Sequence, residues 1–496
     1  MSAYIGIDLG TTFSAVARLD EMGRAAIVHF SDGSNILPSI VSFKTANDIE
    51  TGILKALDDP GEVVAHRFKR EMGTDWLFDA HGKPFSATDL SAFVLKKIKQ
   101  EVDKACGGIV EAVVTVPANF ANDARDATMK AAQMAGINVK YIINEPTAAA
   151  LFFAAEQKGD AGGTYAIYDL GGGTFDMSII KLTGEDVEVL ATDGIHKLGG
   201  RDFDDALTTL VSKKFKAATG EELEFEDFTP NDAEDLKKSL TDREVAKVRI
   251  NRTNIEVTRG EFEEVISSSI AQAEMLCESV MDEADVAPAE IRDIILVGGS
   301  SRMPIISKSI ERVFGKEPKR FGNPDEVVAL GAALYAAYKS DKSGMNQVQL
   351  DAVNSINVSE VTNKYFGTSA LTHNATTGQM VLANSIIINK GQKIPCSVTQ
   401  EYSTVSDDQR KMELDITESN APETDLNFVN IVWRGELDLP PDRPRGQKIE
   451  ITYSYDENQV VHAKFLDVES GNFHEVDIQA GADAKDAIDI NEFLVE

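Results

Sequence analysis

The stretch Tyr168-Asp169-Leu170-Gly171-Gly172-Gly173-Thr174-Phe175-Asp176 decides the fold of this chain. A strand-like run over residues 164–168 leads into an aspartate and three glycines, and an extended pattern resumes at 175–180. Because glycine has no Cβ, such a turn can bring its N–H groups against a phosphate. Bare carboxylates would repel that phosphate, so Asp169 and Asp176 predict a cation between them, Mg²⁺ that keeps its waters. By itself the stretch is equally typical of a plain glycine hairpin.

A second copy of the same pattern opens the chain. Tyr4-Ile5-Gly6-Ile7-Asp8-Leu9-Gly10-Thr11-Thr12 again runs from a strand through Asp-Leu-Gly into hydroxyl side chains. Neither copy is a Walker loop or a dinucleotide G-x-G-x-x-G fingerprint. The repetition predicts duplicated lobes that face one nucleotide, each cradling part of a triphosphate with backbone amides and threonine hydroxyls.

Composition places limits on the class of protein. With 496 residues the chain is too long for one core, so we expect two or three domains. A net charge of -32 argues against nonspecific binding to nucleic acid or to anionic membranes. Cys106, Cys277 and Cys396 lie far apart and form no metal-ligand pattern. The first residues show no signal-peptide pattern and no apolar run is long enough to span a bilayer, which predicts the cytoplasm.

The pattern of elements changes once along the chain. Strands and helices alternate over residues 1–340, which predicts an α/β layered domain, with residues 63–72 expected to be helical. Residues 341–355 are expected to be a polar linker. Residues 356–480 show β-type alternation and predict an all-β sandwich, and residues 481–496 are expected to form an acidic tail.

Seven motifs then occur in a fixed order along the α/β region. They are Ile5-Gly6-Ile7-Asp8-Leu9-Gly10-Thr11-Thr12, Val114-Thr115-Val116-Pro117-Ala118, Ile142-Ile143-Asn144-Glu145-Pro146-Thr147-Ala148-Ala149-Ala150, Asp169-Leu170-Gly171-Gly172-Gly173-Thr174-Phe175-Asp176, Leu198-Gly199-Gly200, Leu296-Val297-Gly298-Gly299-Ser300 and Asn323-Pro324-Asp325-Glu326. Together they resemble the seventy-kilodalton heat-shock chaperones, the DnaK-like family. Lys393-Ile394-Pro395 and Pro444-Arg445-Gly446-Gln447-Lys448-Ile449-Glu450-Ile451-Thr452 extend the resemblance into the β region. It implies an actin-like ATPase domain of two duplicated ribonuclease-H-like lobes, followed by a peptide-binding β-sandwich.

The resemblance also implies roles around the phosphates of ATP or ADP. Asp8, Asp169 and Asp176 would hold Mg²⁺, and K⁺ with it. The phosphate-binding residues would be Gly10, Thr11, Thr12, Phe13, Gly171, Gly172, Gly173 and Thr174. The catalytic residues would be Lys69, Glu145, Thr174 and Asp176, with Lys69 stabilising charge on the γ-phosphate. Taken without these motifs, Lys69 is typical of a solvated helix lysine and Glu145 of a carboxylate at a helix N-terminus.

The adenosine pocket follows from the same resemblance. Its residues would be Gly199, Gly200, Glu234, Lys237, Lys238, Thr241, Gly298, Gly299, Ser300, Arg302 and Asp325. Lys238 stands where the family usually has arginine, and an ammonium stacks on adenine less well than a planar guanidinium does. Nucleotide binding is therefore expected to be weaker than is usual in the family.

Other departures concern the domains and their coupling. Residues 49–91 are fewer than in typical members, and Tyr141 replaces a basic residue used toward J-domain partners. The acidic leucine-rich linker is reduced to Val348-Gln349-Leu350-Asp351. The helical lid is expected to be absent, so bound peptide should exchange fast. Pro117 and Arg125 match the residues that relay the nucleotide state between domains.

In the β region the resemblance is weaker. It suggests a peptide cleft lined by Ile394, Tyr402, Met412 and Leu414, with Phe366, Leu371 or Met380 completing the wall. Any one of these residues is equally typical of a sandwich core. Methionine adapts its shape, which favours Met412 in a promiscuous apolar site.

Three functions are consistent with these residues. The first is a stress-response chaperone that uses ATP hydrolysis to control the binding of unfolded or extended apolar polypeptides, with J-domain and nucleotide-exchange partners. The second is a nucleotide-binding adaptor of low turnover dedicated to one protein. The third is a small-molecule kinase of the actin-like superfamily, which the β domain and the lack of an acceptor-substrate motif argue against. Retention of Lys69, Glu145, Asp169 and Asp176 favours the chaperone.

Overall fold

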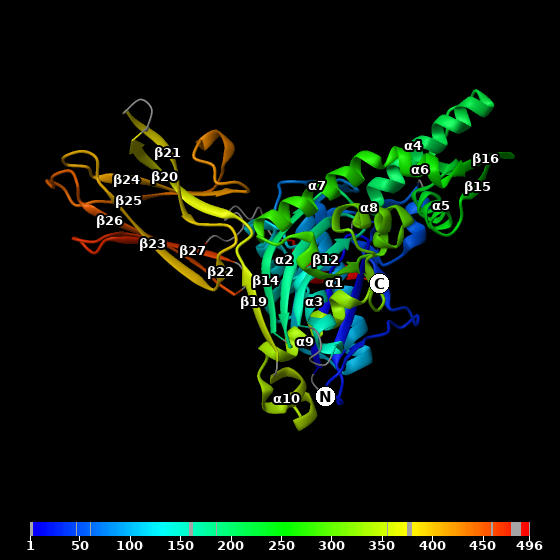
Figure 1. The fold of residues 1–496 in the computed structure, drawn as a ribbon, viewed down its shortest axis with the longest axis horizontal. Coiled ribbons are helices and arrows are strands. Elements are labelled where there is room, and N and C mark those ends of the chain that lie inside the picture. The colour runs from blue at the N-terminus through cyan, green and yellow to red at the C-terminus, as the bar shows by residue number, and fades with distance from the viewer. Residues whose placement is uncertain are drawn as a thin grey trace. The chain divides into compact units, whose positions relative to one another are not determined.

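The chain forms two compact units in a computed structural model (Figure 1). The structure describes residues 3–45, 47–59, 61–157, 162–184, 186–354, 356–373, 379–457, 460–477 and 488–495. The first unit comprises Met1–Phe120, Ala127–Val358 and Ala484–Glu496, and the second comprises Ala121–Asp126 and Ser359–Asp483. The chain therefore leaves the first unit for the second and returns to it near residue 484.

Two sheets of the same topology form the centre of the first unit. One contains the strand order β11-β10-β1-β2-β3, and the other contains the order β18-β17-β12-β13-β14. In each sheet a three-stranded antiparallel meander is extended by two parallel strands. The strands are β1 (Ala3–Asp8), β2 (Phe13–Leu19), β3 (Ala25–Ile27), β4 (Ile36–Pro38), β10 (Ile109–Val116), β11 (Val139–Asn144), β12 (Gly163–Leu170), β13 (Phe175–Thr183), β14 (Asp186–Ile195), β17 (Ile291–Val297) and β18 (Lys319–Arg320). The repeated Asp-Leu-Gly pattern thus belongs to two copies of one lobe.

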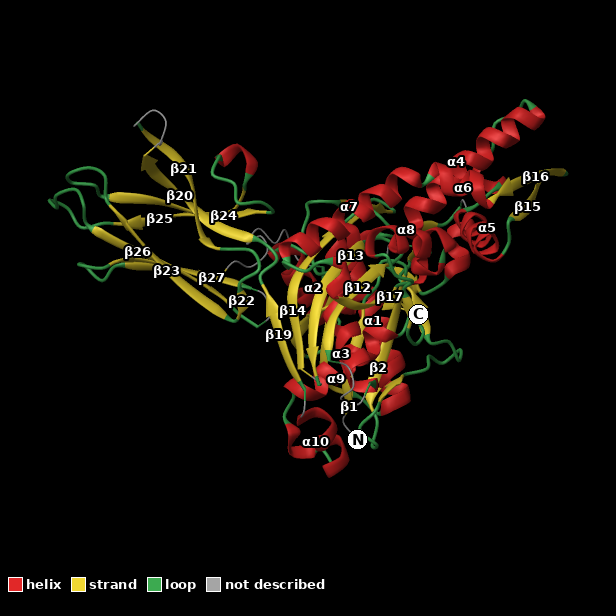
Figure 2. Cartoon of the chain, in the orientation of Figure 1, coloured by secondary structure: helices red, strands yellow, loops and turns green. Residues whose placement is uncertain are grey.

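Helices pack on these sheets and around the hairpin over residues 245–258 (Figure 2). They are α1 (Ala87–Cys106), α2 (Asn122–Met134), α3 (Glu145–Glu156), α4 (Gly200–Thr219), α5 (Pro230–Asp242), α6 (Arg259–Val265), α7 (Ser267–Glu283), α8 (Pro304–Phe314) and α9 (Val327–Lys339). The short 3₁₀ turns of this unit include η1 (Leu54–Asp58), η3 (Phe225–Asp227), η4 (Pro288–Glu290) and η5 (Gly299–Arg302). Helix α9 packs so closely on β1 that a Cβ on Gly6 would lie 2.1 Å from the backbone nitrogen of Ala333. Glycine is therefore required there.

The segment over residues 63–72 departs from the predicted helix. It consists of strand β7 (Val63–Ala65) followed by one 3₁₀ turn, η2 (Phe68–Glu71). Arg67, between the two, has a left-handed backbone conformation with φ of 60°. A residue in that conformation interrupts a right-handed helix, so the prediction of a continuous helix was wrong.

A small sheet of the first lobe includes the far end of the chain. Its order is β29-β6-β5-β7, with β5 (Val41–Phe43), β6 (Asp48–Thr51) and β29 (Leu494–Val495). Residues 488–495, within the segment expected to be an acidic tail, form η8 (Ile490–Glu492) and β29. Strand β29 pairs with β6 in parallel. Residues 481–487 of that predicted tail lie outside the described residues.

Two hairpins and a helix complete the first unit. The hairpins are β8 (Leu77–Ala80) with β9 (Lys83–Ser86), and β15 (Val245–Ile250) with β16 (Thr253–Thr258). The segment expected to be a linker contains η6 (Lys342–Gly344) and α10 (Gln347–Asn354). Gln349 donates to the backbone oxygen of Asp20 at 2.9 Å, and Val353 is fully buried. This segment is thus ordered on the β2–β3 turn.

The second unit is built from two four-stranded antiparallel sheets. Their orders are β21-β20-β24-β25 and β23-β26-β27-β28. The strands are β20 (Tyr365–His373), β21 (Met380–Ile388), β23 (Cys396–Ser403), β24 (Lys411–Ser419), β25 (Asn430–Asp438), β26 (Lys448–Tyr455), β27 (Val461–Asp467) and β28 (Phe473–Asp477), with β22 (Lys393–Ile394) and η7 (Leu426–Phe428) beside them. Strand β19 (Asn357–Val361) leads into this unit. Alternate residues such as Ile449, Ile451 and Tyr453 point into one apolar core. The predicted fold class, two α/β lobes followed by an all-β sandwich, is confirmed.

Candidate functional site

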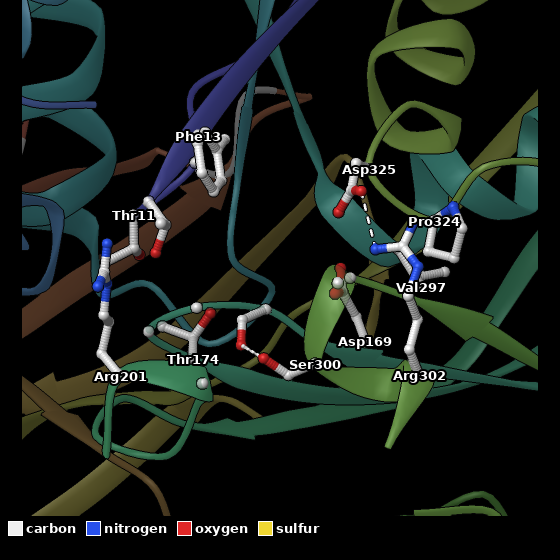
Figure 3. Close-up of a pocket in the computed structure, with 18 of the residues that line it drawn as sticks. Thr11, Phe13, Asp169, Thr174, Arg201, Val297, Ser300, Arg302, Pro324 and Asp325 are labelled. Carbon is white, nitrogen blue, oxygen red and sulfur yellow. Dashed lines mark hydrogen bonds and ion pairs between the residues drawn. The ribbon is translucent and has the colours of Figure 1, made fainter. Parts of the chain in front are cut away.

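A cavity of about 410 Å³ lies in the first unit, where the two glycine turns meet. It is lined by residues from both lobes, and Figure 3 shows Thr11 and Phe13 of the first turn facing Thr174 of the second. The wall also includes Val297, Pro324 and Val328. A concave site of this size with apolar walls and a few converging polar groups is typical of a nucleotide-sized ligand.

The first turn connects β1 to β2. A Cβ on Gly10 would lie 2.0 Å from the backbone oxygen of Phe13, so a side chain has no room in this turn. Ser39 supports the turn from outside, since its hydroxyl donates to the Gly10 oxygen at 2.7 Å and its backbone N–H donates to the Thr12 oxygen at 2.8 Å. These contacts fix the backbone around Thr11 before any ligand binds.

The second turn, residues 171–174, packs directly against the first. A Cβ on Gly172 would lie 1.9 Å from Thr12 Oγ1, and one on Gly173 would lie 2.4 Å from Thr11 Cγ2. The Gly200 N–H donates to the Gly171 oxygen at 3.0 Å, and Ser300 Oγ donates to the same oxygen at 2.9 Å. Glycines are therefore needed where the two turns touch, which favours a shared phosphate cradle over a plain hairpin.

Buried carboxylates lie at the ends of β1, β12 and β13. Burial, followed by the charge of Glu145, raises the pKa of Asp8 to about 7 and the pKa of Asp176 to about 8. Burial and the charges of Glu145, Asp176 and Asp8 also raise the pKa of Asp169 well above its ordinary value. Asp169 and Asp176 are cross-strand partners. The protein alone does not compensate the charges of this carboxylate cluster.

The donor set fits a cation held beside a phosphate. Among the described residues, no three carboxylate, histidine or cysteine side chains are placed to ligate one metal ion directly. Mg²⁺ bound through its waters and through the phosphates of a nucleotide needs no such group. The buried Thr12 Oγ1 also has no hydrogen-bond partner in the part of the chain that the structure describes. A cation with its hydration shell would balance the cluster of Asp8, Asp169 and Asp176.

Lys69 is a buried cation that lies beside these carboxylates. Its side chain is only 4% exposed, and Nζ forms an ion pair with Glu145 Oε1. Glu145 is at the start of α3, directly after β11, so the backbone of the first lobe positions the carboxylate. Both side chains line the cavity. A solvated surface lysine would not show this burial, so the structure removes that reading of Lys69.

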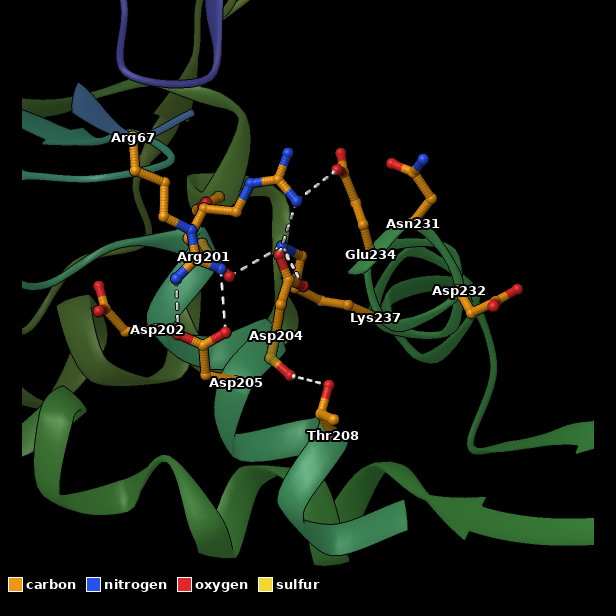
Figure 4. A network of polar contacts seen from close by, with 12 residues as sticks. Arg67, Arg201, Asp202, Asp204, Asp205, Thr208, Asn231, Asp232, Glu234 and Lys237 are labelled. Carbon is orange, nitrogen blue, oxygen red and sulfur yellow. Dashed lines mark hydrogen bonds and ion pairs between the residues drawn. The ribbon is translucent and has the colours of Figure 1, made fainter. Parts of the chain in front are cut away.

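Two arginines beside Lys69 connect the lobes. Arg67 forms a bidentate pair with Asp205 at 2.7 and 2.9 Å (Figure 4). Arg70 forms another with Asp202 at 3.0 and 2.6 Å. Both aspartates are on the first turns of α4 in the second lobe. Bidentate pairs fix orientation as well as distance, so the lysine segment is held against the opposite lobe.

Helix α5 supplies one side of the remaining cavity. Four of its residues line the cavity because their helical spacing places them on one face: Glu234, Lys237, Lys238 and Thr241. Lys238 is 61% exposed on its side chain and pairs with Glu234 at 2.9 Å. The opposite side is formed by Gly298, Gly299, Ser300 and Arg302, and Arg302 Nη1 pairs with Asp325 at 2.8 Å (Figure 3). Such a slot between two walls suits a flat ring.

Sequence reasoning missed Arg201 and Asp204, which also line the cavity. Arg201 is 4% exposed and lies 3.4 Å from Glu234 and 3.7 Å from Asp204. Lys237 pairs with Asp204 at 2.7 Å, which closes a buried network (Figure 4). Their position directly after Gly199-Gly200 was the signal that could have found them, because a helix that begins at a phosphate loop presents its first turn to the ligand.

Most of the nucleotide residues expected from the sequence line this one cavity, and two do not. Asp176 is fully buried behind Asp169, and Gly199 packs against the second turn, where a Cβ would lie 2.6 Å from the Gly173 nitrogen. Further lining residues that were not expected are Ile36, Asp242, Val297, Met303, Pro324 and Val328. The individual roles stay predictions.

The residues expected to bind peptide lie in or beside the sandwich core. Ile394 and Leu414 are buried in it, at 9% and 3% exposure, while Tyr402 and Met412 are half-buried at its border. Tyr402 shares a hydrogen bond of 2.9 Å with Ser385 Oγ. Phe366 is buried, whereas Leu371 and Met380 are exposed. The placement of the peptide cleft stays a prediction, and so does the relay role of Pro117 and Arg125, which are both buried.

Two lobes of one topology around a paired phosphate cradle, joined to a β-sandwich, define an actin-like ATPase with an appended binding domain. A family model described as Hsp70 protein matches residues 4–79 and 62–495. The chain therefore belongs to the Hsp70 family.

Membership establishes the general properties of the chain. Hsp70 proteins are ATP-dependent chaperones that hydrolyse ATP, use Mg²⁺ and act on unfolded polypeptides together with co-chaperones, and this chain carries that general role. Within the described part of the chain, no helix is long and apolar enough to cross a bilayer.

Proposed function

We propose that this chain hydrolyses ATP in the cavity of the first unit and that the nucleotide state controls the affinity of the β-sandwich for extended apolar peptide. The observation that carries the proposal is the buried Lys69–Glu145 pair, which lies beside Asp8 and Asp169 in a cavity shared with both glycine turns. Such a cluster is costly to bury, and a site that only binds nucleotide does not need it.

The chain's own residues account for the chemistry. Bound Mg²⁺ would neutralise the phosphates and polarise the γ-phosphoryl group. The glycine turns hold the β- and γ-phosphates with backbone N–H groups, and Lys69 stabilises the charge that develops on the γ-phosphoryl oxygens. Asp176 is the residue expected to orient the attacking water, but its carboxylate is buried and does not line the cavity, so this role requires the site to open toward it when ATP binds. The water adds to the γ-phosphorus while the bond from that phosphorus to the β-phosphate oxygen breaks, and that oxygen leaves with ADP. One proton of the water stays on the phosphate product and the other is released to solvent.

The assignment of K⁺ rests on the same cluster. Burial and then the charge of Glu145 raise the pKa values of Asp8, Asp169 and Asp176, and the charges of Asp176 and Asp8 raise the pKa of Asp169 further. A monovalent cation next to Mg²⁺ would reduce that repulsion further. Replacing K⁺ by a large organic cation such as tetramethylammonium, at constant ionic strength, should therefore lower the rate of hydrolysis.

The experiment that tests the function is a steady-state ATPase assay with and without an extended apolar peptide. A rate that rises with peptide supports the coupled chaperone, because it shows that the peptide site acts on the nucleotide site. Binding of ATP without turnover would support the adaptor of low turnover instead. Titration of a fluorescent peptide in ATP and in ADP then measures the coupling directly.

A further inference from the structure

Residues 488–495, hereafter the strap, are built into the first lobe. Ile490, Phe493 and Val495 are 2%, 4% and 6% exposed. Phe493 lies with its ring centroid 5.9 Å from that of Phe85 and 5.2 Å from that of Phe93. Because three apolar side chains of this short segment are buried, the strap docks at a specific site on the first lobe.

Polar groups of the lobe fix the strap's backbone. Lys96 Nζ donates to the backbone oxygens of Ile490 at 2.8 Å and Phe493 at 3.3 Å. Lys83 Nζ lies 4.1 Å from the centroid of the Phe493 ring. Strand β29 covers the edge of β6, with Leu494 opposite Asp48 and Val495 opposite Ile49. These contacts therefore fix both the register and the direction of the strap on the first lobe.

The sheet beneath the strap leads to the catalytic lysine. Ile49 of β6 pairs with Phe43 of β5, and Phe43 pairs with Val63 of β7. Strand β7 ends at Ala65, and the chain then passes through the left-handed Arg67 into the turn that carries Lys69. Two strand pairs and one turn thus connect β6 to the backbone of Lys69.

Helix α1 provides a second connection. Its residue Lys96 binds the strap, and its residue Ser91 contacts Met72, the residue after η2, with 3.3 Å between Ser91 Oγ and Met72 Sδ. Phe93 of α1 also contacts the Phe43 ring, at 6.5 Å between centroids. The strap, α1 and the small sheet therefore form one packed cluster beneath the Lys69 turn.

We propose that the strap is a positioning element for Lys69, so that its docking sets the rate of phosphoryl transfer and leaves nucleotide binding unchanged. This inference rests on the proposed ATPase function. Phe493 is the central positioning residue, because it joins Phe85 and Phe93 on one side and continues into β29 on the other. A misplacement of a reacting group by about 1 Å can lower a rate about 100-fold.

The test compares the full chain with a protein ending at residue 487, each with saturating Mg²⁺ and ATP. We expect kcat to fall at least about tenfold in the shortened protein while KM for ATP stays within about twofold. A peptide of residues 488–495, added at about 1 mM to match the effective concentration of a tethered segment, should restore the rate. The same peptide with Phe493→Ala should not.

Two full-length variants protect the test against misfolding of the shortened protein. Lys96→Met removes both backbone anchors of the strap and should lower kcat in the same direction, whereas Glu492→Gln, at an exposed position, should not. An unchanged kcat in the shortened protein, or a peptide that raises its melting temperature without raising kcat, would show that the strap only stabilises the lobe. If the full chain itself fails to hydrolyse ATP, the proposed function falls and this inference falls with it.

Discussion

Replacing Lys69 by methionine tests the catalytic assignment most directly, because methionine keeps the apolar stem and removes the charge. Lys69 is 4% exposed and its ammonium contacts the Glu145 carboxylate. If the ammonium stabilises charge that appears mainly in the transition state, its loss costs about 2.7–4 kcal/mol, a fall of about 10²–10³ in kcat. ATP affinity should remain nearly intact, since the glycine turns supply the phosphate contacts.

The same substitution leaves Glu145 buried without its partner. Breaking a buried pair in this way typically costs about 3–5 kcal/mol of folding free energy. A second variant, Lys69→Met with Glu145→Gln, removes both charges and should recover most of that stability while remaining slow. Lys99→Met, at a position whose side chain is 33% exposed, serves as the matched control.

The assay is single-turnover hydrolysis of pre-bound ATP, combined with urea unfolding of each variant. The decisive comparison is between rate and stability in the double variant. If that variant regained the parent rate along with its stability, Lys69 would act only by neutralising Glu145. A single variant that hydrolyses ATP at the parent rate would return Lys69 to a structural role.

Four further predictions test other parts of the chain. Asp169→Asn should impair Mg²⁺-dependent hydrolysis because it removes a negative charge that orients the metal, and EDTA should then slow the parent to a similar rate. Gly172→Ala should abolish nucleotide binding, measured with a fluorescent ATP analogue, because its Cβ would lie 1.9 Å from Thr12 Oγ1. Tyr402→Ala should weaken binding of a fluorescent apolar peptide without unfolding the sandwich; unchanged affinity in a folded variant would refute the cleft. Burial alone would lower the pKa of His462, but hydrogen bonds from its ring to nearby carboxylates outweigh burial, and the pKa in the folded protein is raised. The stabilisation that His462 gives the sandwich is therefore full below pH 6.5 and is lost as pH rises through the folded pKa. His462→Gln should remove that pH dependence from urea unfolding curves.

That the two glycine turns meet at one cavity was predictable, because the motifs that form them are local in sequence. The pattern Asp-Leu-Gly followed by small or hydroxyl residues specifies a strand and a tight turn within nine residues, as over residues 168–176. The two copies then predicted the two lobes, since one triphosphate needs both turns. Arg201 was missed because its position in the cavity wall depends on a contact with the Glu234 carboxylate, 33 positions later, which no local pattern reveals.

Elsewhere the sequence pattern was misleading for physical reasons. Residues 63–72 have the charges of an amphipathic helix, yet Arg67 adopts a left-handed conformation and pairs with Asp205 of the other lobe. The acidic composition near the end of the chain concealed Ile490, Phe493 and Val495, whose burial depends on a surface made about 400 positions earlier.

That separation has a consequence for how the protein is made. Phe93 emerges from the ribosome 400 residues before Phe493, and at about 5–20 residues per second this interval lasts roughly 20–80 s. During that time the edge of β6 and the rings of Phe85 and Phe93 have no partner from the strap. A nascent chain in this state presents an open strand edge beside an apolar surface, the kind of segment that other chaperones bind. The first lobe is synthesised first, and it is nevertheless among the last parts of this protein to complete its fold.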